Sequence, residues 1–177
     1  VAFDAHSGQQ VWEVGLDSVL PVAPVLSGGL LLLSGTDSLI EYPDSRKVYL
    51  TAIDTLAAVQ AAANQQPVQP RWLFTIDATG QQPEPTTPVA ANGRVYCCVW
   101  SQTGTPLLDV LQVDAATGAG TQLYGDMDIF GTAYNQVSAI APLMAPVKLP
   151  TGQTVPTLVL AGPDGLYALH LDGSGEY

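Results

Sequence analysis

Short hydrophobic runs, each joined to the next by a glycine-centred turn, recur along the chain. "PVLSGGLLLLSG" begins at Pro24 and "PVAANGRVYCCV" begins at Pro88. Both stretches predict a strand, a tight turn and a second strand. "PTLVLAGPDGLYAL", from Pro156, repeats the later half of such a unit. Short strands separated by turns at regular intervals predict an all-β fold.

A second repeated pattern places an acidic residue in a turn between two further strands. Its four copies start at Ala2, Ala52, Gln112 and Ala168. Asp4, Asp54 and Asp114 hold equivalent places, at spacings of 50 and 60 residues, and His170 stands in that place in the fourth copy. In "DAHSG" and "DAATG" the carboxylate can accept hydrogen bonds from the following backbone N–H groups, and the glycine supplies a positive φ. The three aspartates are therefore interpreted as turn formers. They are spaced like calcium ligands, but single carboxylates on separate units do not make a calcium site.

The two patterns alternate, so that each full unit has two strands before the acidic turn, one strand entering it and one leaving it. A long repeat of four strands predicts a β-propeller with four-stranded antiparallel blades. The expected blades cover residues 1–18 (partial), 19–80, 81–126 and 135–177 (partial), all within a single domain of 1–177. This makes about three to four blades, fewer than a closed ring usually needs.

An incomplete ring would leave open sheet edges. Because the chain begins at Val1 inside an expected strand, we expect it to be a piece of a longer propeller. The other interpretation is that two chains form a homodimer that completes one ring.

The second unit contains an insertion between its third and fourth strands. Residues 55–70 read "TLAAVQAAANQQPVQP", which is rich in alanine and ends in two prolines. Asp54 or Thr55 can cap a helix that runs from Leu56 to about Asn64. We expect this insertion to lie on one rim of the propeller.

The acidic turns and the tryptophans that follow them carry a family resemblance. Ala2, Asp4, Ser7, Gly8 and Trp12 follow the pattern Ala-x-Asp-x-x-(Thr/Ser)-Gly-x-x-x-Trp at every position. This pattern resembles the tryptophan-docking repeat of the quinoprotein-like β-propellers. The second unit keeps Ala52, Asp54 and Trp72, whereas the third keeps Asp114, Thr117 and Gly118 but has glutamine at 112 and 122.

The resemblance implies that each tryptophan packs on the backbone of the adjoining blade. It also implies a non-catalytic binding, scaffold or sensor module that mediates protein–protein or ligand interactions, with no cofactor. The alternative is a fragment of a dehydrogenase that uses pyrroloquinoline quinone and calcium, because family enzymes of that type carry a disulfide between adjacent cysteines that stacks on the quinone.

Cys97 and Cys98 are adjacent, but they lie within an expected strand. Alternation along a strand directs one side chain to each face, whereas a disulfide between neighbours needs a turn-like peptide. The enzyme motif also resembles Cys-Cys-Asp followed by Val-Asn-Arg, and here Val99, Trp100 and Ser101 follow. We therefore interpret both cysteines as small buried hydrophobic residues, with the disulfide as the alternative.

Composition narrows the function further. The 16 acidic residues exceed the five basic ones, giving a net charge of −11. Such a charge disfavours nucleic acid and anionic membranes as partners, and no run is long enough to span a membrane. His6 and His170 are the two histidines, and neither GxSxG nor HExxH occurs, so a hydrolase is not supported. A protein partner, or the rest of a parent propeller, is expected. A periplasmic or cell-surface location is favoured but not determined.

Overall fold

The computed structural model describes residues 1–16, 22–37, 47–78, 83–101, 107–127, 141–162 and 165–172. These residues form 14 antiparallel strands and one short helix, so the predicted all-β class is confirmed. The strands make four sheets that follow one another in sequence order. Within the described ranges, no helix has the length and apolar character that a membrane crossing requires.

The second sheet consists of β3 (Val25–Ser27), β4 (Leu30–Thr36), β5 (Lys47–Asp54) and β6 (Trp72–Asp77), paired in chain order. Gly28 and Gly29, both at positive φ, join β3 to β4 in a two-residue turn. Two consecutive positive φ angles match the twist of the flanking strands, and glycine adopts them without steric cost. The strand, tight turn and strand expected from Pro24 are therefore present.

The third sheet repeats this arrangement with β8 (Val89–Ala91), β9 (Arg94–Ser101), β10 (Leu107–Asp114) and β11 (Gly120–Met127). Asn92 and Gly93 form the positive-φ turn between β8 and β9. A fifth strand, β7 (Pro83–Pro85), also pairs with β9. It lies on the same edge of β9 as β8 does, but it pairs with the C-terminal part of β9. The sequence pattern does not predict β7, because strand signals rarely include two prolines in three residues.

Thr86 marks the break between β7 and β8 and is completely buried. Its N–H donates to the Cys98 carbonyl at 2.8 Å, and its hydroxyl oxygen accepts from the Cys98 N–H at 3.1 Å. Its carbonyl accepts from the Ser34 hydroxyl at 2.7 Å, which links β4 of the second sheet to the third sheet. The break in the edge strand thus leaves these buried polar groups paired.

The first and last sheets are smaller. β1 (Ala2–Phe3) and β2 (Gln10–Trp12) form a two-stranded sheet. β12 (Leu143–Lys148), β13 (Thr154–Gly162) and β14 (Gly165–Leu169) form a three-stranded one.

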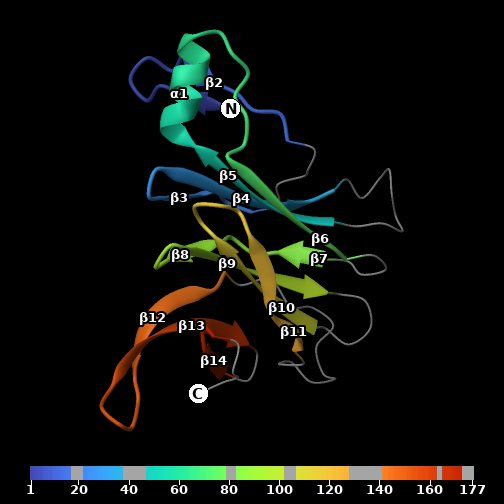
Figure 1. Cartoon of the computed structure of the whole chain (residues 1–177), viewed down its shortest axis with the longest axis vertical. Helices are drawn as coiled ribbons and strands as arrows, with labels where there is room; N and C mark the ends of the chain where they lie inside the picture. The colour runs from blue at the N-terminus through green and yellow to red at the C-terminus, as the bar shows by residue number, and fades with distance from the viewer. Residues whose placement is uncertain are drawn as a thin grey trace.

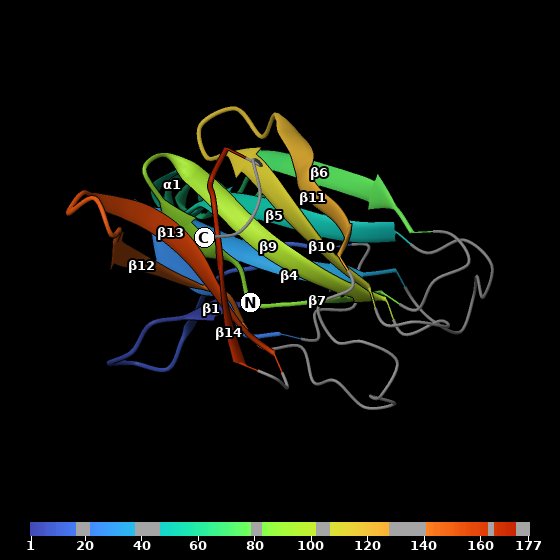
Figure 2. The same ribbon diagram turned by 90° about the horizontal axis from the view of Figure 1, so that it is seen from below.

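The four sheets lie one after another along the long axis, with the N-terminus and the C-terminus toward opposite ends (Figure 1). Figure 2 looks along this stack and shows the sheets overlying one another. The described residues therefore form an open stack of sheets, and no closed propeller ring is seen among them.

Hydrophobic cores fill the spaces between successive sheets. Leu30, Leu32, Leu50, Ala52 and Trp72 of the second sheet meet Val95, Cys97 and Val113 of the third. On the far side of the third sheet, Tyr96, Cys98, Trp100, Leu108 and Val110 meet Leu158, Leu160 and Leu169 of the fourth. The third sheet thus buries apolar side chains on both faces, as a sheet in the middle of a stack requires.

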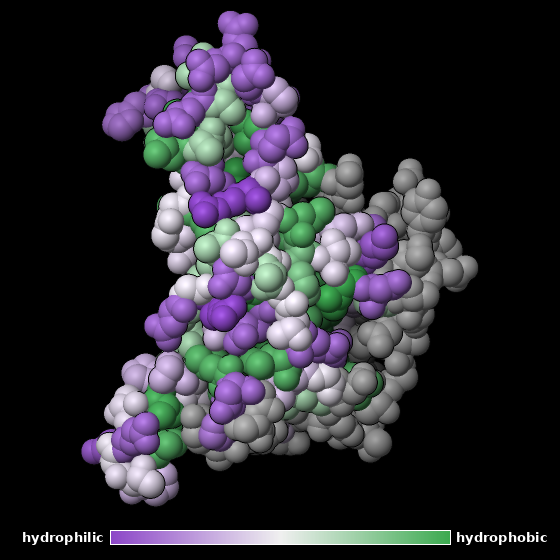
Figure 3. Space-filling model, viewed as in Figure 1, coloured by the Kyte–Doolittle hydropathy of each residue, from purple (hydrophilic) through white to green (hydrophobic). Residues whose placement is uncertain are grey.

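The insertion in the second unit forms α1 (Thr55–Ala63), between β5 and β6 as expected. Asp54 caps the helix by accepting a hydrogen bond from the Ala57 N–H at 3.0 Å. Ala58, on the buried side of α1, lies in one apolar cluster with Trp12, Ile53 and Val68. α1 lies beyond one end of the sheets (Figure 1), and the surface around it is largely hydrophilic in Figure 3.

Candidate binding cleft at the turn end of the sheets

The acidic turns of the first and third sheets have the same geometry. The Asp4 carboxylate accepts from the Ser7 N–H at 2.7 Å, the Ser7 hydroxyl at 2.8 Å and the His6 N–H at 3.0 Å. Asp114 accepts from the Thr117 N–H and hydroxyl, each at 2.9 Å, and from the Ala116 N–H at 3.1 Å. Gly8 and Gly118 follow at φ +69° and +75°. Each carboxylate thus organises a closed turn.

Hydrogen bonding lowers the pKa of these aspartates. For Asp4 the main cause is the Ser7 N–H, followed by the Ser7 hydroxyl and the His6 N–H. For Asp114 the main cause is the Thr117 N–H, followed by the Thr117 hydroxyl, with the Arg94 charge contributing less. The pKa of Asp54 is lowered mainly by the Ala57 N–H. Hydrogen bonds to the ionised form favour it, so these turns are most stable with charged carboxylates.

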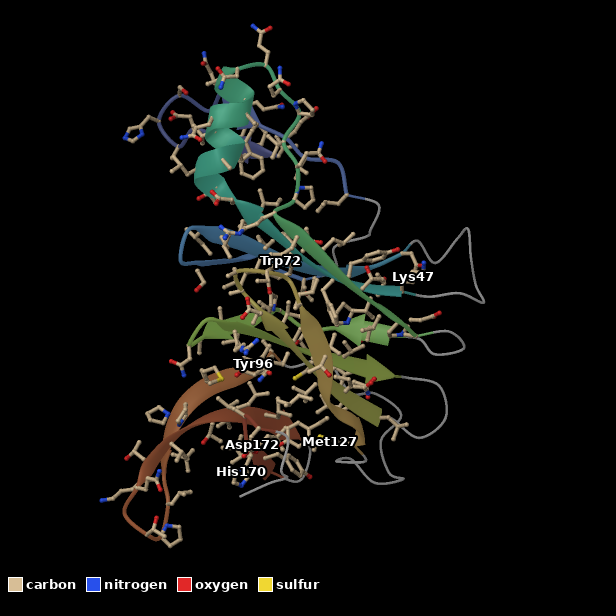
Figure 4. All side chains as sticks on the ribbon, viewed as in Figure 1. Lys47, Trp72, Tyr96, Met127, His170 and Asp172 are labelled. Carbon is tan, nitrogen blue, oxygen red and sulfur yellow. The ribbon has the colours of Figure 1, made fainter. Side chains whose placement is uncertain are left out.

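Trp72 connects the second sheet to the acidic turn of the third. Its indole N–H donates to the Ala115 carbonyl at 2.9 Å, across 43 residues of sequence. Its side chain also covers Gly118, where an added Cβ would lie 2.5 Å from the Trp72 Cβ. A side chain at position 118 is therefore excluded twice, by this contact and by the positive φ. Figure 4 labels Trp72 at the level between the two sheets.

The corresponding residues at the other two junctions differ. Trp12 is buried in the cluster that includes Ala58 of α1, because the second unit carries a helix where the others have a closed turn. In the third unit Gln122 stands where the tryptophan of the repeat is expected, and Gln112 of β10 donates to the Leu171 carbonyl at 3.2 Å. Tyr124 of β11 donates its hydroxyl to the His170 carbonyl at 2.6 Å. The turn at His170 thus contacts the preceding sheet through different side chains.

Two arginines lie beside the junction between the second and third sheets. Arg71 Nη1 lies 3.2 Å from Asp54 Oδ2, and Arg71 Nε donates to the Ala116 carbonyl at 3.4 Å. Arg94 Nη1 lies 3.2 Å from Asp114 Oδ2. Sequence reasoning missed both. For Arg94 a signal existed, because it directly follows the Asn92–Gly93 turn and pairs in register with Asp114. Both pairs are partly exposed and therefore contribute little stability by themselves.

These turns surround a cleft between the second and third sheets. The cleft has a volume of about 570 Å³. The turn between β3 and β4, the turn between β8 and β9, and the turn after β10 all contribute to its lining. Its polar lining comes from Ser27, Arg71, Asn92, Arg94 and Asp114, while Leu30, Leu32 and Val95 form an apolar floor. A concave surface with an apolar floor and a few polar groups is typical of binding sites.

Cys97 and Cys98 lie on opposite faces of β9. Cys97 belongs to the core shared with the second sheet, whereas Cys98 belongs to the core shared with the fourth. The Cys97 thiol donates to the Thr86 carbonyl at 3.3 Å. Burial raises the pKa of Cys97 to about 12, and burial together with the neighbouring Cys97 raises that of Cys98 well above its ordinary value. Such thiols are inert in the folded state.

The structure thus brings Asp54, Trp72, Asp114 and Gly118 together at one junction and keeps Asp4, Ser7 and Gly8 in a separate hairpin. Among the described residues, no group of three or more His, Cys, Asp or Glu side chains could hold a metal ion. No model of a known protein family matches the chain, and no curated protein matches it.

Replacing Trp72 tests how much the junction contributes to stability. Trp72→Phe removes one hydrogen bond and should lower the free energy of unfolding by about 1 kcal/mol. Trp72→Ala should lower it by about 3–5 kcal/mol, because it also removes the buried ring. Leu73→Ala, at the next residue on the exposed side of β6, is the control and should stay within about 0.5 kcal/mol. Urea denaturation followed by circular dichroism measures all three, and equal losses for Trp72→Ala and Leu73→Ala would contradict the assignment.

Acid titration tests the turn carboxylates. Their pKa values are lower folded than unfolded, so their stabilisation is present above the unfolded value of about 4 and is lost as the pH falls through the folded values. The thermal midpoint should therefore fall as the pH drops below about 4. Asp114→Asn keeps an acceptor oxygen but not the charge, so it should reduce this dependence. Glu84→Gln, on the exposed side of β7, removes one carboxylate outside the acidic turns and serves as the control for the loss of a single negative charge.

Thiol titration tests the two cysteines. Without reductant, the unfolded protein should show two free thiols, and the native protein should react slowly because both thiols are buried. The unfolded Cys97→Ala and Cys98→Ala variants should each show one free thiol. Finding no free thiol in the unfolded wild type would instead support the disulfide.

Proposed function

We propose that this chain is a segment of a β-propeller and acts as a non-catalytic binding module. Its sheets would be successive blades, and the cleft at the turn end would take a protein or peptide segment. The observation that carries the proposal is the cleft itself, where turns from two successive sheets meet beside the Trp72 junction. Clefts between packed elements are common binding sites because loops on a rigid scaffold keep their positions.

Several features of the stack support the propeller architecture. The second and third sheets share strand order, paired turns and hydrophobic faces. A backbone link also recurs, because the Thr55 N–H donates to the Gly29 carbonyl at 3.0 Å and the Ala115 N–H donates to the Gly93 carbonyl at 2.9 Å. The tryptophan contact runs from one sheet to the acidic turn of the next, as the resemblance implies.

The quinone-dependent dehydrogenase receives less support from these residues. A disulfide that stacks on a quinone needs both sulfur atoms at one surface, but Cys97 and Cys98 belong to cores on opposite sides of β9. The two cysteines therefore do not fit that role. The arginines of the cleft are each paired with an aspartate, an arrangement suited to orienting a partner's polar groups.

A matched pair of variants tests binding at the cleft. Ala116 and His6 hold the same position in two equivalent turns, but only Ala116 lines the cleft. Ala116→Trp should block the cleft, whereas His6→Trp should leave it open. Peptides selected from a displayed random library on the wild type should include clones that bind His6→Trp equally and Ala116→Trp at least about tenfold more weakly.

The proposal fails if every selected clone binds both variants alike. The non-catalytic role is wrong if added pyrroloquinoline quinone and calcium raise the melting temperature of the protein and support dye-linked alcohol oxidation.

A further inference from the structure

Two junctions between successive sheets have the same arrangement: that of the second sheet with the third, and that of the third sheet with the fourth. We call the face of a sheet that points toward the preceding sheet its leading face, and the opposite face its trailing face. Leu30, Leu32 and Leu50 on the trailing face of the second sheet pack on the leading face of the third. Tyr96, Trp100 and Val110 on the trailing face of the third pack on the leading face of the fourth. All these contacts are between apolar side chains.

The leading face of the second sheet is covered only in part. The register pairs Leu26 with Leu31 and Leu31 with Ile53, so these three residues share that face. Trp12 and α1 cover Leu33 and Ile53, whereas Leu26 is 67% exposed. The uncovered part is a cleft of about 740 Å³ beside β1 and β2, and none of the side chains that line it is charged.

The trailing face of the fourth sheet is also apolar. Leu158, Leu160 and Leu169 point toward the third sheet, so the residues that alternate with them, Val159, Ala161 and Ala168, lie on the other face. Their register partners Leu143 and Leu166 share that face, as does the fully buried Thr157. Leu143 is 62% exposed and Leu166 is 76% exposed. Leu26 on the second sheet and the pair Leu143 and Leu166 on the fourth are grouped with other apolar residues, and such exposed groups need an explanation that single scattered leucines do not.

We propose that the trailing face of the fourth sheet packs into the apolar cleft on the second sheet of another copy of this chain, head to tail. The inference rests on the proposed blade-like stacking. The exposed apolar parts of these two faces have the same orientation as the two halves of the junction that occurs twice among the described sheets, so a second copy supplies a matching half. Because each copy has one face of each kind, two copies can close on each other through two equal junctions.

Charge gives this association a distinctive salt dependence. Each chain carries a net charge of −11, so two copies repel each other at low ionic strength. The faces that meet are uncharged. Added sodium chloride should screen the repulsion and tighten the association, whereas an interface built on ion pairs would weaken.

Analytical ultracentrifugation of the full chain tests the proposal. The wild type should sediment as a species of twice the chain mass at high concentration and dissociate on dilution. Leu26→Asp and Leu166→Asp should each raise the dissociation constant at least about 100-fold, because each would bury an unpaired carboxylate at both junctions. Leu56→Asp on α1, where the leucine is 66% exposed, is the matched control and should behave as the wild type. Circular dichroism checks that all three variants fold.

Mixing the two variants gives the sharper result. A pair made of Leu26→Asp and Leu166→Asp chains has one junction with both changes and one that is unaltered. The mixture should therefore associate more strongly than either variant alone. A symmetric interface built on a single patch would show no such recovery.

A wild type that stays at the mass of one chain in high salt overturns the proposal, as does association that both substitutions leave unchanged. If the protein stays monomeric and Leu26→Asp binds an apolar dye more weakly than the wild type does, the cleft would be assigned to a small ligand instead. None of these results affects peptide binding at the turn end, so the two proposals can fail independently.

Discussion

The contact between Trp72 and the acidic turn of the third sheet is the constraint on which the arrangement of the central sheets depends. The indole must reach the Ala115 carbonyl and cover Gly118 at once, and this fixes both the distance and the rotation between two sheets. Phe74, two residues along β6, packs over Gly120 in the same way. Two aromatic rings on two glycines give the junction shape complementarity in addition to buried area.

The position of the cleft follows from this contact. The turn that receives Trp72 also holds Asp114, which pairs with Arg94, and the segment before Trp72 holds Arg71, which reaches Ala116. The residues that set the spacing of the sheets are therefore next to the residues that line the opening between them. A site built in this way is positioned before any partner arrives, which lowers the entropic cost of binding.

Local signals in the sequence are sufficient for the local structure. The Asn92–Gly93 turn, the acidic turns at Asp4 and Asp114 and the cap at Asp54 each depend on residues within a few positions, and the structure has them where the pattern predicts. The propeller ring, the number of blades and the function remain predictions.

Side-chain contacts between one sheet and the next are harder to predict from the sequence. Gln112 departs from the repeat pattern, yet it donates to the turn of the fourth sheet, a contact that depends on how the sheets stack. Arg71 likewise acquires its role from a turn that lies 45 residues later. Strand β7 depends on pairing with β9, which compensates for its two prolines.

The prolines of β7 have a consequence for the behaviour of the protein at high concentration. The Thr86 N–H points toward β9, and alternation along the strand then directs the nitrogens of Pro83 and Pro85 away from it. Because proline has no N–H group, the outer side of β7 has no donor at positions 83 and 85 for a foreign strand to bind. This edge is therefore a poor template for strand addition, the usual first step in the aggregation of β-proteins.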